Sequence, residues 1–314
     1  MLKIVFLDRG SLPVAVRRPA LPHDWTEYEA TTPAEVVVRI QDADVVITNK
    51  VKLDADALAQ VRQLKLIAVS ATGTNNIDLA AAQARSIPVC NIRGYADSTV
   101  PEHALMLMLA LARSLPAYQY DVAAGEWARS PHFCLFGAPI RDLNGKTVAI
   151  IGHGSLGQRT AALCAAFGMQ VLKVEHRHAT AVRPGYTAFN EALAVADVIS
   201  LHCPLTEATR GLIGAAELAT MKPDALLINT ARGGLVDEAA LAEALADHRL
   251  GGAGFDVLHE EPPRQGNPLL TLRQPNLIVT PHVGWASFDA MSRLAEQLIG
   301  NIEAWARGEP RHLV

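Results

Sequence analysis

Short apolar runs alternate with amphipathic stretches along almost the whole chain. Apolar runs of about 4–8 residues between turn residues are typical of buried strands, and amphipathic stretches between them are typical of helices that cover a parallel sheet. In the first hundred residues this pattern predicts strands at Lys3–Leu7, Asp44–Thr48, Lys65–Ser70 and Pro88–Ile92, and helices that include Asp54–Val61 and Asp78–Arg85.

A long helix is predicted from about Val100 to Gly125, and the alternation resumes after it. Further strands are expected near residues 147–151, 170–174, 197–201, 225–229, 252–256 and 277–280. Six strands are the number that a complete dinucleotide-binding sheet needs. The tail from Ala286 to Ala306 is predicted to be a helix, because apolar residues recur on one of its faces.

We therefore expect an α/β protein with two Rossmann-like parallel-sheet domains and a cleft between them. A length of 314 residues is sufficient for two domains. The substrate domain is expected to comprise residues 1–98 and 287–314, and the dinucleotide-binding domain residues 99–286. The active site is expected in the cleft.

Composition narrows the possible functions. Half of the residues are hydrophobic, 19% are charged and the formal net charge is -4, so no basic surface is expected for nucleic acid or an anionic membrane. The apolar run Ala104–Ala112 is too short to span a bilayer, and the N-terminus reads as a strand and not as a signal peptide. Four scattered cysteines without a metal-ligand spacing predict free thiols, a cytoplasmic location and no metal site.

The most informative motif is G-x-G-x-x-G at Gly152, Gly154 and Gly157, between a predicted strand and a predicted helix. In dinucleotide-binding sheets the first glycine allows a tight turn, the second lets the backbone approach the pyrophosphate, and the third lets the helix pack closely. The loop also contains Ser155 and Leu156, where the helix N-terminus would offer N–H groups to phosphate. A glycine turn without a ligand is the structural alternative, and the surrounding pattern disfavours it.

Glu175 ends the strand that follows this helix. A carboxylate there can accept hydrogen bonds from the adenosine ribose and should repel a 2′-phosphate, so NAD is the predicted cofactor. NADP remains possible, because His176, Arg177 and His178 follow immediately and Arg177 could bind that phosphate.

Polar side chains follow the last three predicted strands, where ligands bind in open parallel sheets. Arg232, Asp256 and His282 each come after one of these strands. Histidine is a natural proton donor near neutral pH, a carboxylate beside it would hold its orientation, and arginine can grip a substrate carboxylate bidentately. These residues predict reduction of a carbonyl in a carboxylate-bearing substrate.

Motifs along nearly the whole chain resemble the D-isomer-specific 2-hydroxyacid dehydrogenase family. They are ATGTNNID at 71–78, DLNGKT at 142–147, the glycine motif, LHCPLT at 201–206, NTARGG at 229–234, GFDV at 254–257, EP at 261–262 and TPH at 280–282. The segments FLDRGSLP at 6–13, TNKVK at 48–52 and WAS at 285–287 are most similar to the glycerate dehydrogenase, or hydroxypyruvate reductase, branch.

The resemblance implies a mechanism and a set of roles. Hydride would pass from the nicotinamide to C2 of a small 2-oxo acid, with Arg232, Glu261 and His282 as the catalytic residues; Glu261 is preferred to Glu260 because it directly precedes a proline. Backbone N–H groups of Ala71, Thr72 and Gly73 would share the substrate carboxylate with Arg232. The remaining residues expected to contact the cofactor are Cys203, Pro204, Thr209, Thr230, Ala231 and Asp256, the last on the nicotinamide carboxamide.

Several alternatives remain open at this level. Hydroxypyruvate or glyoxylate is the expected substrate, 3-phosphoglycerate is a rival, and a non-catalytic NAD-sensing corepressor of the same fold is a different class of function. The family implies a homodimer. Four residues have two interpretations each, functional and structural: Lys50, His103, His202 and Trp285.

Overall fold

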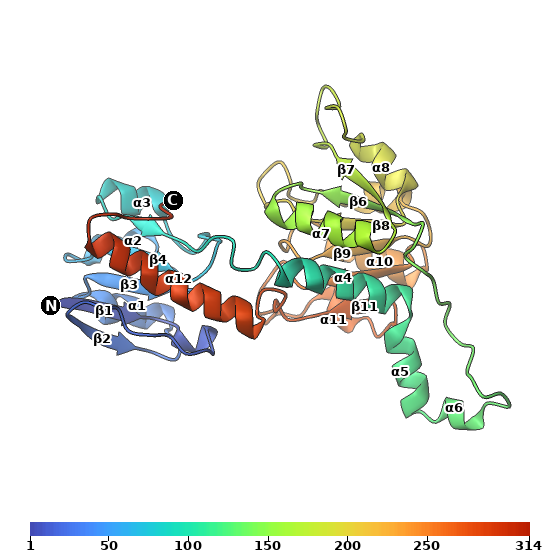
Figure 1. The fold of residues 1–314 in the computed structure, drawn as a ribbon, viewed down its shortest axis with the longest axis horizontal. Coiled ribbons are helices and arrows are strands. Elements are labelled where there is room, and N and C mark those ends of the chain that lie inside the picture. The colour runs from blue at the N-terminus through green and yellow to red at the C-terminus, as the bar shows by residue number, and fades with distance from the viewer. The chain divides into compact units, whose positions relative to one another are not determined.

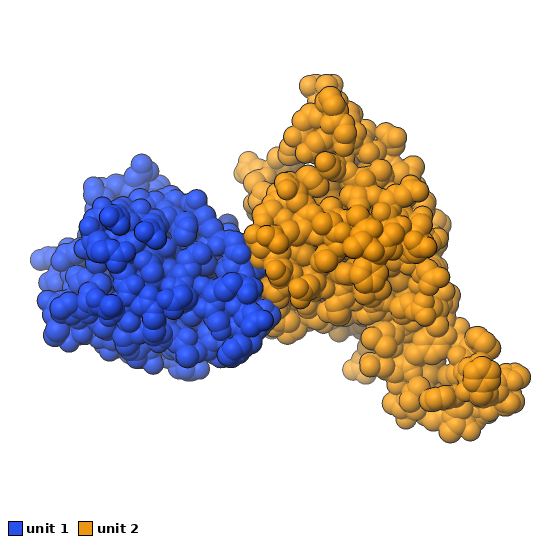
Figure 2. Space-filling view, in the orientation of Figure 1, with its two compact units in different colours: residues 1–96, 286–314 blue, residues 97–285 orange.

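The computed structural model describes residues 1–314, which form two compact units (Figures 1 and 2). Unit 1 comprises Met1–Ala96 and Ala286–Val314, and unit 2 comprises Asp97–Trp285. Each unit contains one parallel sheet with helices packed on it, which confirms the predicted α/β class with two parallel-sheet units. None of the helices combines the length and apolar composition needed to cross a membrane.

Unit 1 has a five-stranded sheet in the order β2-β1-β3-β4-β5. Its elements are β1 (Leu2–Phe6), η1 (Arg9–Ser11), β2 (His23–Glu27), η2 (Pro33–Glu35), α1 (Val36–Ile40), β3 (Val45–Thr48), α2 (Ala55–Gln60), β4 (Leu66–Val69), α3 (Leu79–Ala84), β5 (Val89–Cys90) and α12 (Phe288–Ala306). Strands β3 and β4 are apolar except for Thr48 and are buried at every position, as expected for a sheet covered on both faces. Asp54 and Asp78 cap α2 and α3 by accepting backbone N–H groups.

Strand β2 was not predicted from the sequence. It reads HDWTE, and none of its residues is fully buried. The strand is parallel to β1 at the edge of the sheet, with Leu2 opposite His23 and Phe6 opposite Glu27. An edge strand needs no apolar face of its own, so hydrophobic periodicity does not reveal it.

Unit 2 has a six-stranded sheet in the order β11-β10-β9-β8-β6-β7. Its elements are α4 (Thr99–Ala112), α5 (Leu115–Ala123), α6 (Glu126–Arg129), β6 (Thr147–Ile151), α7 (Ser155–Ala166), β7 (Gln170–Val174), α8 (Phe189–Val195), β8 (Val198–Leu201), α9 (Ala215–Thr220), β9 (Leu226–Asn229), α10 (Glu238–Ala246), β10 (Gly252–Phe255), α11 (Pro268–Thr271) and β11 (Leu277–Val279). All neighbouring strands are parallel.

The two sheets share one strand order, because β7-β6-β8-β9-β10 repeats β2-β1-β3-β4-β5. The order reverses between β1 and β3 in unit 1 and between β6 and β8 in unit 2. Such a reversal is the topological switch point, where open parallel sheets bind ligands.

The predicted helix from Val100 to Gly125 was wrong as a single element. It is broken between α4 and α5, where Ser114 has a left-handed backbone with φ 49° and Pro116 lies in the first turn of α5. Proline is tolerated at a helix start but not in a helix interior, which accounts for the break. Helix α4 is buried in the core of unit 2. Helices α5 and α6 instead project from the unit 2 sheet as an arm (Figure 1).

Candidate functional site

The glycine loop joins β6 to α7 as the sequence predicted. Gly152 has φ +92°, and a Cβ there would lie 2.5 Å from the backbone nitrogen of Cys203, so both its conformation and its surroundings require glycine. A Cβ at Gly157 would collide with the carbonyl oxygen of Gly152. A Cβ at Gly154 would meet nothing within 4 Å. The first and third glycines thus serve the chain's own packing, whereas the second leaves space beside the N-terminus of α7.

Ser155 and Leu156 form the first turn of α7, and Ser155 is exposed. The backbone N–H groups of a helix's first turn have no partner within the helix. With Gly154 open, this turn can receive an anion without displacing any side chain. The loop therefore fits the pyrophosphate of a dinucleotide.

Glu175 follows β7, as predicted, but its carboxylate is already bonded. It accepts from the backbone nitrogen of His176 at 2.9 Å and from that of Arg183 at 3.1 Å, and from Nε and Nη2 of Arg183 at 2.6 and 2.7 Å. The hydrogen bonds from Arg183 lower the pKa of Glu175 to about 2. Arg177 is directed elsewhere, because its guanidinium bonds to Glu217 and to the carbonyl of Leu212.

The loops after β8 and β9 carry the other residues expected beside the cofactor. Cys203 and Pro204 follow β8, and the Thr209 hydroxyl donates to the carbonyl of Pro204 at 2.7 Å, which closes that turn. Thr230 and Ala231 follow β9. The Thr230 hydroxyl and Nδ1 of His153 are buried without a hydrogen-bond partner. Such atoms are costly unless something bonds them, so they fit a polar ligand on this edge of the sheet.

Arg232 lies in a turn that Asn229 holds at both ends. The buried Asn229 amide accepts from the Ala231 nitrogen at 3.1 Å and donates to the Arg232 carbonyl at 2.9 Å. A Cβ at Gly233 would collide with the carbonyl of Leu258, so this turn packs directly against the segment that leads to Glu261. The Arg232 side chain donates to the Ala231 carbonyl at 2.7 Å and is partly exposed.

Asp256, at the end of β10, holds the loop that follows β11. Its buried carboxylate accepts from the Thr280 hydroxyl at 2.6 Å and from the backbone nitrogens of Val283 and Gly284 at 2.9 and 2.8 Å. His103 Nε2 lies 2.9 Å from the Thr280 oxygen. Because the Thr280 proton goes to Asp256, His103 must donate to Thr280 through Nε2–H. Asp256 therefore already has protein partners, in addition to any contact with a nicotinamide carboxamide.

His282 and Glu261, which the family resemblance implied as catalytic residues, lie in contact. His282 Nδ1 lies 2.6 Å from Glu261 Oε2, and Glu261 Oε1 accepts from the Leu258 nitrogen at 2.9 Å. The two side chains are 28% and 34% exposed, so both can be reached by a small molecule. His282 has φ 55°, a strained backbone conformation that is secured by the hydrogen bonds from the Val283 and Gly284 nitrogens to Asp256. An ionised carboxylate only accepts, so it fixes a hydrogen on Nδ1 and leaves Nε2 for proton transfer.

Each of the four residues with two interpretations, Lys50, His103, His202 and Trp285, has a hydrogen-bond partner within its own unit. His103 belongs to the Asp256 network, and His202 Nε2 is 2.8 Å from the Ser200 hydroxyl, with its pKa lowered to about 4 by burial. Trp285 Nε1 donates to the His282 carbonyl at 2.9 Å. The backbone nitrogen of Lys50 donates to Asp8 at 2.7 Å. No group of three or more His, Cys, Asp or Glu side chains in residues 1–314 is arranged to hold a metal ion.

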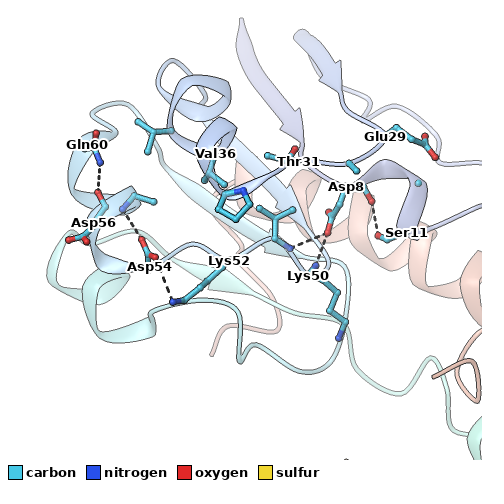
Figure 3. Close-up of a pocket in the computed structure, with 16 residues that line it drawn as sticks. Asp8, Ser11, Glu29, Thr31, Val36, Lys50, Lys52, Asp54, Asp56 and Gln60 are labelled. Carbon is cyan, nitrogen blue, oxygen red and sulfur yellow. Dashed lines mark hydrogen bonds and ion pairs between the residues drawn. The ribbon is translucent and has the colours of Figure 1, made fainter. Parts of the chain in front are cut away.

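In unit 1 the switch point is occupied by a carboxylate of the chain itself. Asp8, after β1, is buried and accepts the backbone N–H groups of Asn49, Lys50 and Val51 at distances of 2.7 to 3.2 Å. A hollow of about 800 Å³ lies beside this loop, between α1 and α2 (Figure 3). On its rim Lys52 pairs with Asp54 at 3.7 Å.

The predicted substrate loop follows β4 in unit 1. Ala71 is buried and its carbonyl accepts from the Ile92 nitrogen at 3.0 Å, whereas Thr72 is exposed and Gly73 is partly exposed. The Thr72 hydroxyl donates to the Ile92 carbonyl at 2.8 Å, and the Thr72 carbonyl accepts from Asn91 at 2.8 Å. These bonds fix the loop at the carboxyl edge of its own sheet.

Sequence reasoning missed four residues that shape these loops: Asp8, His103 in its network role, Arg183 and Asn229. Asn229 belongs to the quoted NTARGG motif, so its place before a turn could have suggested a side chain that bonds backbone. Arg183 gave no comparable signal, because it lies in a polar loop well after Glu175.

Comparison with known proteins identifies the family. A model described as D-isomer specific 2-hydroxyacid dehydrogenase, NAD binding domain, matches residues 105–284, which lie within unit 2 and contain the glycine loop. The chain is 51% identical over 313 residues to a glycerate dehydrogenase of Methylorubrum extorquens, covering 99% of this chain and 98% of that one. It is 34% identical over 306 residues to a hydroxypyruvate reductase of Blautia hydrogenotrophica, covering 93% and 94%.

A solved structure supports the same relationship. The D-lactate dehydrogenase of Aquifex aeolicus, complexed with NAD and lactic acid, is similar with a TM-score of 0.81 and 26% identity over 98% of this chain and 96% of that one. The resemblance inferred from the motifs is therefore confirmed, and unit 2 contains an NAD-binding domain of this family.

Proposed function

Because this chain belongs to the D-isomer specific 2-hydroxyacid dehydrogenase family, we propose that it reduces a small 2-oxo acid to the D-2-hydroxy acid. Hydroxypyruvate and glyoxylate are the proposed substrates, by analogy with relatives named glycerate dehydrogenase, hydroxypyruvate reductase and glyoxylate reductase. The observation that carries the proposal is the 2.6 Å contact between His282 and Glu261 at the carboxyl edge of the sheet that contains the glycine loop.

The cofactor would be held by the carboxyl edge of the unit 2 sheet. The first turn of α7 would bind the pyrophosphate, with the Thr209 turn near the phosphates, while Cys203, Pro204, Thr230 and Ala231 would border the dinucleotide. The nicotinamide, when bound in its reduced form, supplies the hydride. Asp256 would face its carboxamide and at the same time hold the loop of His282.

The protein's own chemistry is proton delivery and charge complementarity. His282 would protonate the carbonyl oxygen of the substrate from Nε2 while Glu261 stabilises the ring through Nδ1. Arg232 would bind the substrate carboxylate, and the backbone N–H groups of Ala71, Thr72 and Gly73 would share it. Residues 1–98 and 287–314 would then act as the substrate domain, and residues 99–286 as the cofactor domain.

The test is a panel of purified protein with NADH or NADPH and four 2-oxo acids: hydroxypyruvate, glyoxylate, pyruvate and 3-phosphohydroxypyruvate. We expect the fastest cofactor oxidation with hydroxypyruvate or glyoxylate, and chiral chromatography should identify D-glycerate as the product from hydroxypyruvate. Fastest turnover of 3-phosphohydroxypyruvate would replace the proposed substrate. Tight cofactor binding without turnover of any of the four would favour an NAD-sensing role.

We also propose that the protein is a homodimer assembled through the arm, residues 115–140. The arm exposes large apolar side chains, among them Phe133 at 92% and Phe136 at 86%. Exposed apolar groups gathered in one segment mark an interaction surface. The apolar face of α4 is not part of this surface, because it is buried in the core of unit 2.

Light scattering coupled to gel filtration would test this assembly. The native protein should have twice the chain mass of 33.6 kDa, and the double variant Phe133→Asp, Phe136→Asp should have the mass of one chain. A native mass of one chain would refute the dimer. The four free thiols are compatible with the cytoplasm, which we propose as the location.

A further inference from the structure

At the end of β7 the sequence predicts an exposed carboxylate, Glu175, but the structure exposes a guanidinium, that of Arg183. An ionised carboxylate has about four acceptor positions, and Glu175 receives four N–H donors, three of them from Arg183. Glu175 is only 3% exposed as a side chain, whereas Arg183 is 53% exposed. A ribose hydroxyl could donate to Glu175 only by displacing Arg183, so the group that faces solvent here is the guanidinium.

Arg183 retains donors after it has bonded Glu175. A guanidinium carries five N–H groups in a planar fork, and only Nε and Nη2 bond the carboxylate, so Nη1 has no partner in residues 1–314. Its Cζ lies 4.0 Å from the centroid of the Tyr186 ring. Carboxylate on one edge and aromatic ring on one face hold the guanidinium in place and leave its outer edge open.

Arg183 is also close to the glycine loop. The Tyr186 ring on which it stacks meets the ring of His153 edge-on, with 6.4 Å between centroids. His153 lies between Gly152 and Gly154. The series His153, Tyr186, Arg183 therefore leads from the candidate pyrophosphate site to the end of β7, which is the direction from pyrophosphate to adenosine ribose in this fold.

We propose that Arg183, clamped by Glu175, binds the 2′-phosphate of NADPH, so that this chain accepts NADPH at least as well as NADH although β7 ends in an acid. The inference rests on the proposed cofactor-dependent function and specifies its cofactor. A guanidinium edge pairs bidentately with phosphate oxygens. The charge of Glu175 is balanced by Arg183, so it does not exclude the phosphate. Arg177 is not the ligand, because Glu217 and the Leu212 carbonyl hold it.

The experiment measures dissociation constants of NADPH and NADH by nicotinamide fluorescence, without substrate. The native protein should bind NADPH with an affinity equal to or greater than that for NADH. In Arg183→Gln the NADPH dissociation constant should rise about 10- to 100-fold, the effect of losing charge-assisted hydrogen bonds, and the NADH value should change less than about threefold. Native binding of NADH that is tighter than that of NADPH would overturn the proposal.

Two further variants separate a binding role from a structural one. In Arg183→Gln the Glu175 carboxylate is left without its partner and repels the 2′-phosphate. The double variant Glu175→Gln, Arg183→Gln lacks this carboxylate, so it should bind NADPH about tenfold more tightly than Arg183→Gln does. Arg183→Lys keeps the charge without the fork and should lie between native and Arg183→Gln. Arg177→Gln and Arg249→Gln, the latter in an exposed pair with Asp247, should leave the NADPH constant unchanged. A loss with Arg177→Gln equal to that with Arg183→Gln would refute the assignment.

A competition experiment keeps this inference distinct from the proposed reaction. Adenosine 2′,5′-bisphosphate should displace NADPH better than adenosine 5′-monophosphate does, and Arg183→Gln should abolish the difference. This outcome would support the 2′-phosphate site even if no 2-oxo acid were reduced. Equal competition by the two nucleotides in the native protein would refute the site even if the reductase activity were confirmed.

Discussion

The two units contain sheets of one strand order but fill their switch points differently. In unit 1 the carboxylate of Asp8 occupies the place between β1 and β3 and bonds three backbone N–H groups. In unit 2 the place after β6 holds Gly152 and Gly154, and a Cβ on Gly154 would meet nothing. Backbone donors at a switch point attract an anion. Unit 1 provides that anion from its own chain, and unit 2 leaves the position open for a ligand.

A second comparison concerns the buried aspartates. Asp8 after β1 and Asp256 after β10 both bond the backbone of the loop that follows the neighbouring strand. The loop held by Asp8 carries Lys50, and the loop held by Asp256 carries His282 in contact with Glu261. In both units a buried aspartate therefore fixes the loop after the neighbouring strand. The units differ in the side chain that this loop carries, which is a lysine in unit 1 and a histidine in unit 2.

The largest expected effect is on kcat, and it tests His282 on the loop that Asp256 holds. His282→Ala should reduce kcat about 10³-fold, because a positioned general acid typically contributes 10²–10⁴-fold. Cofactor affinity should remain within about threefold of native, since the glycine loop is untouched. His248→Asn, at an exposed position just after α10, is the matched control and should be fully active. A His282→Ala enzyme that retains more than about a tenth of native kcat would remove histidine as the proton donor.

The next largest effect separates the two roles of glycine at the open switch point. Gly152→Ala should lower the free energy of unfolding of unit 2 by about 3–4 kcal/mol, because the backbone is left-handed and the added Cβ meets the Cys203 nitrogen. Gly154→Ala should change stability by less than about 0.5 kcal/mol and weaken cofactor binding roughly tenfold or more, because only a ligand would meet its Cβ. Calorimetry and fluorescence titration measure the two quantities. Unchanged cofactor affinity in Gly154→Ala would contradict an anion site there.

The strands were predictable from sequence to within a few residues, because their apolar runs are the cores of covered sheets. The edge strand β2 was not, since its stability comes from pairing with β1 and not from burial of its own side chains. The break at Ser114 was missed because the apolar pattern of α4 and α5 continues across it. The left-handed backbone of Ser114 leaves no mark on the hydrophobic pattern.

The candidate site divides in the same way. Gly152 and His282 follow strand ends, where ligands bind, and Glu261 was identified by the family motif in which it precedes a proline. The clamp of Arg183 on Glu175 does not, because it depends on how the loop between β7 and α8 folds back onto the strand. The residue type at the end of β7 therefore predicted a ribose contact at Glu175, but it did not predict the Arg183 guanidinium that covers this carboxylate.

A smaller effect is expected where unit 1 fills its own switch point. Asp8→Ala should lower the free energy of unfolding of unit 1 by about 2–3 kcal/mol, because three backbone N–H groups lose their acceptor in a buried place. The exposed Asp24→Ala is the matched control and should be close to neutral. Cofactor affinity should be unchanged, because the glycine loop belongs to unit 2. Loss of cofactor binding in Asp8→Ala with unit 1 still folded would show that the two switch points do not act separately.

The smallest effect concerns the pH dependence of stability, because the two units should lose unfolding free energy in different pH ranges. Burial lowers the pKa of His202 from 6.5 to about 4, and burial also lowers the pKa of His153. Between pH 6.5 and pH 4, His202 binds a proton in the unfolded chain but stays neutral in folded unit 2. The free energy of unfolding of unit 2 therefore decreases as the pH falls from about 6.5 towards 4. In unit 1 the hydrogen bond from Arg17 lowers the pKa of Glu303 from 4.5 to about 2, so its contribution is present above pH 4.5 and is lost as the pH falls towards 2.

Unit 2 should consequently lose stability at a higher pH than unit 1 on acidification. His202→Gln keeps a group that can bond Ser200 but does not titrate, so the loss of unfolding free energy between pH 7 and pH 5 should be smaller than in the native protein by about 1–2 kcal/mol. Urea unfolding of both proteins at the two pH values measures this difference. Parallel losses in native and variant protein would mean that His202 is free to take up its proton in the folded state, and that the loop beside Gly152 is more open to water than its contacts indicate.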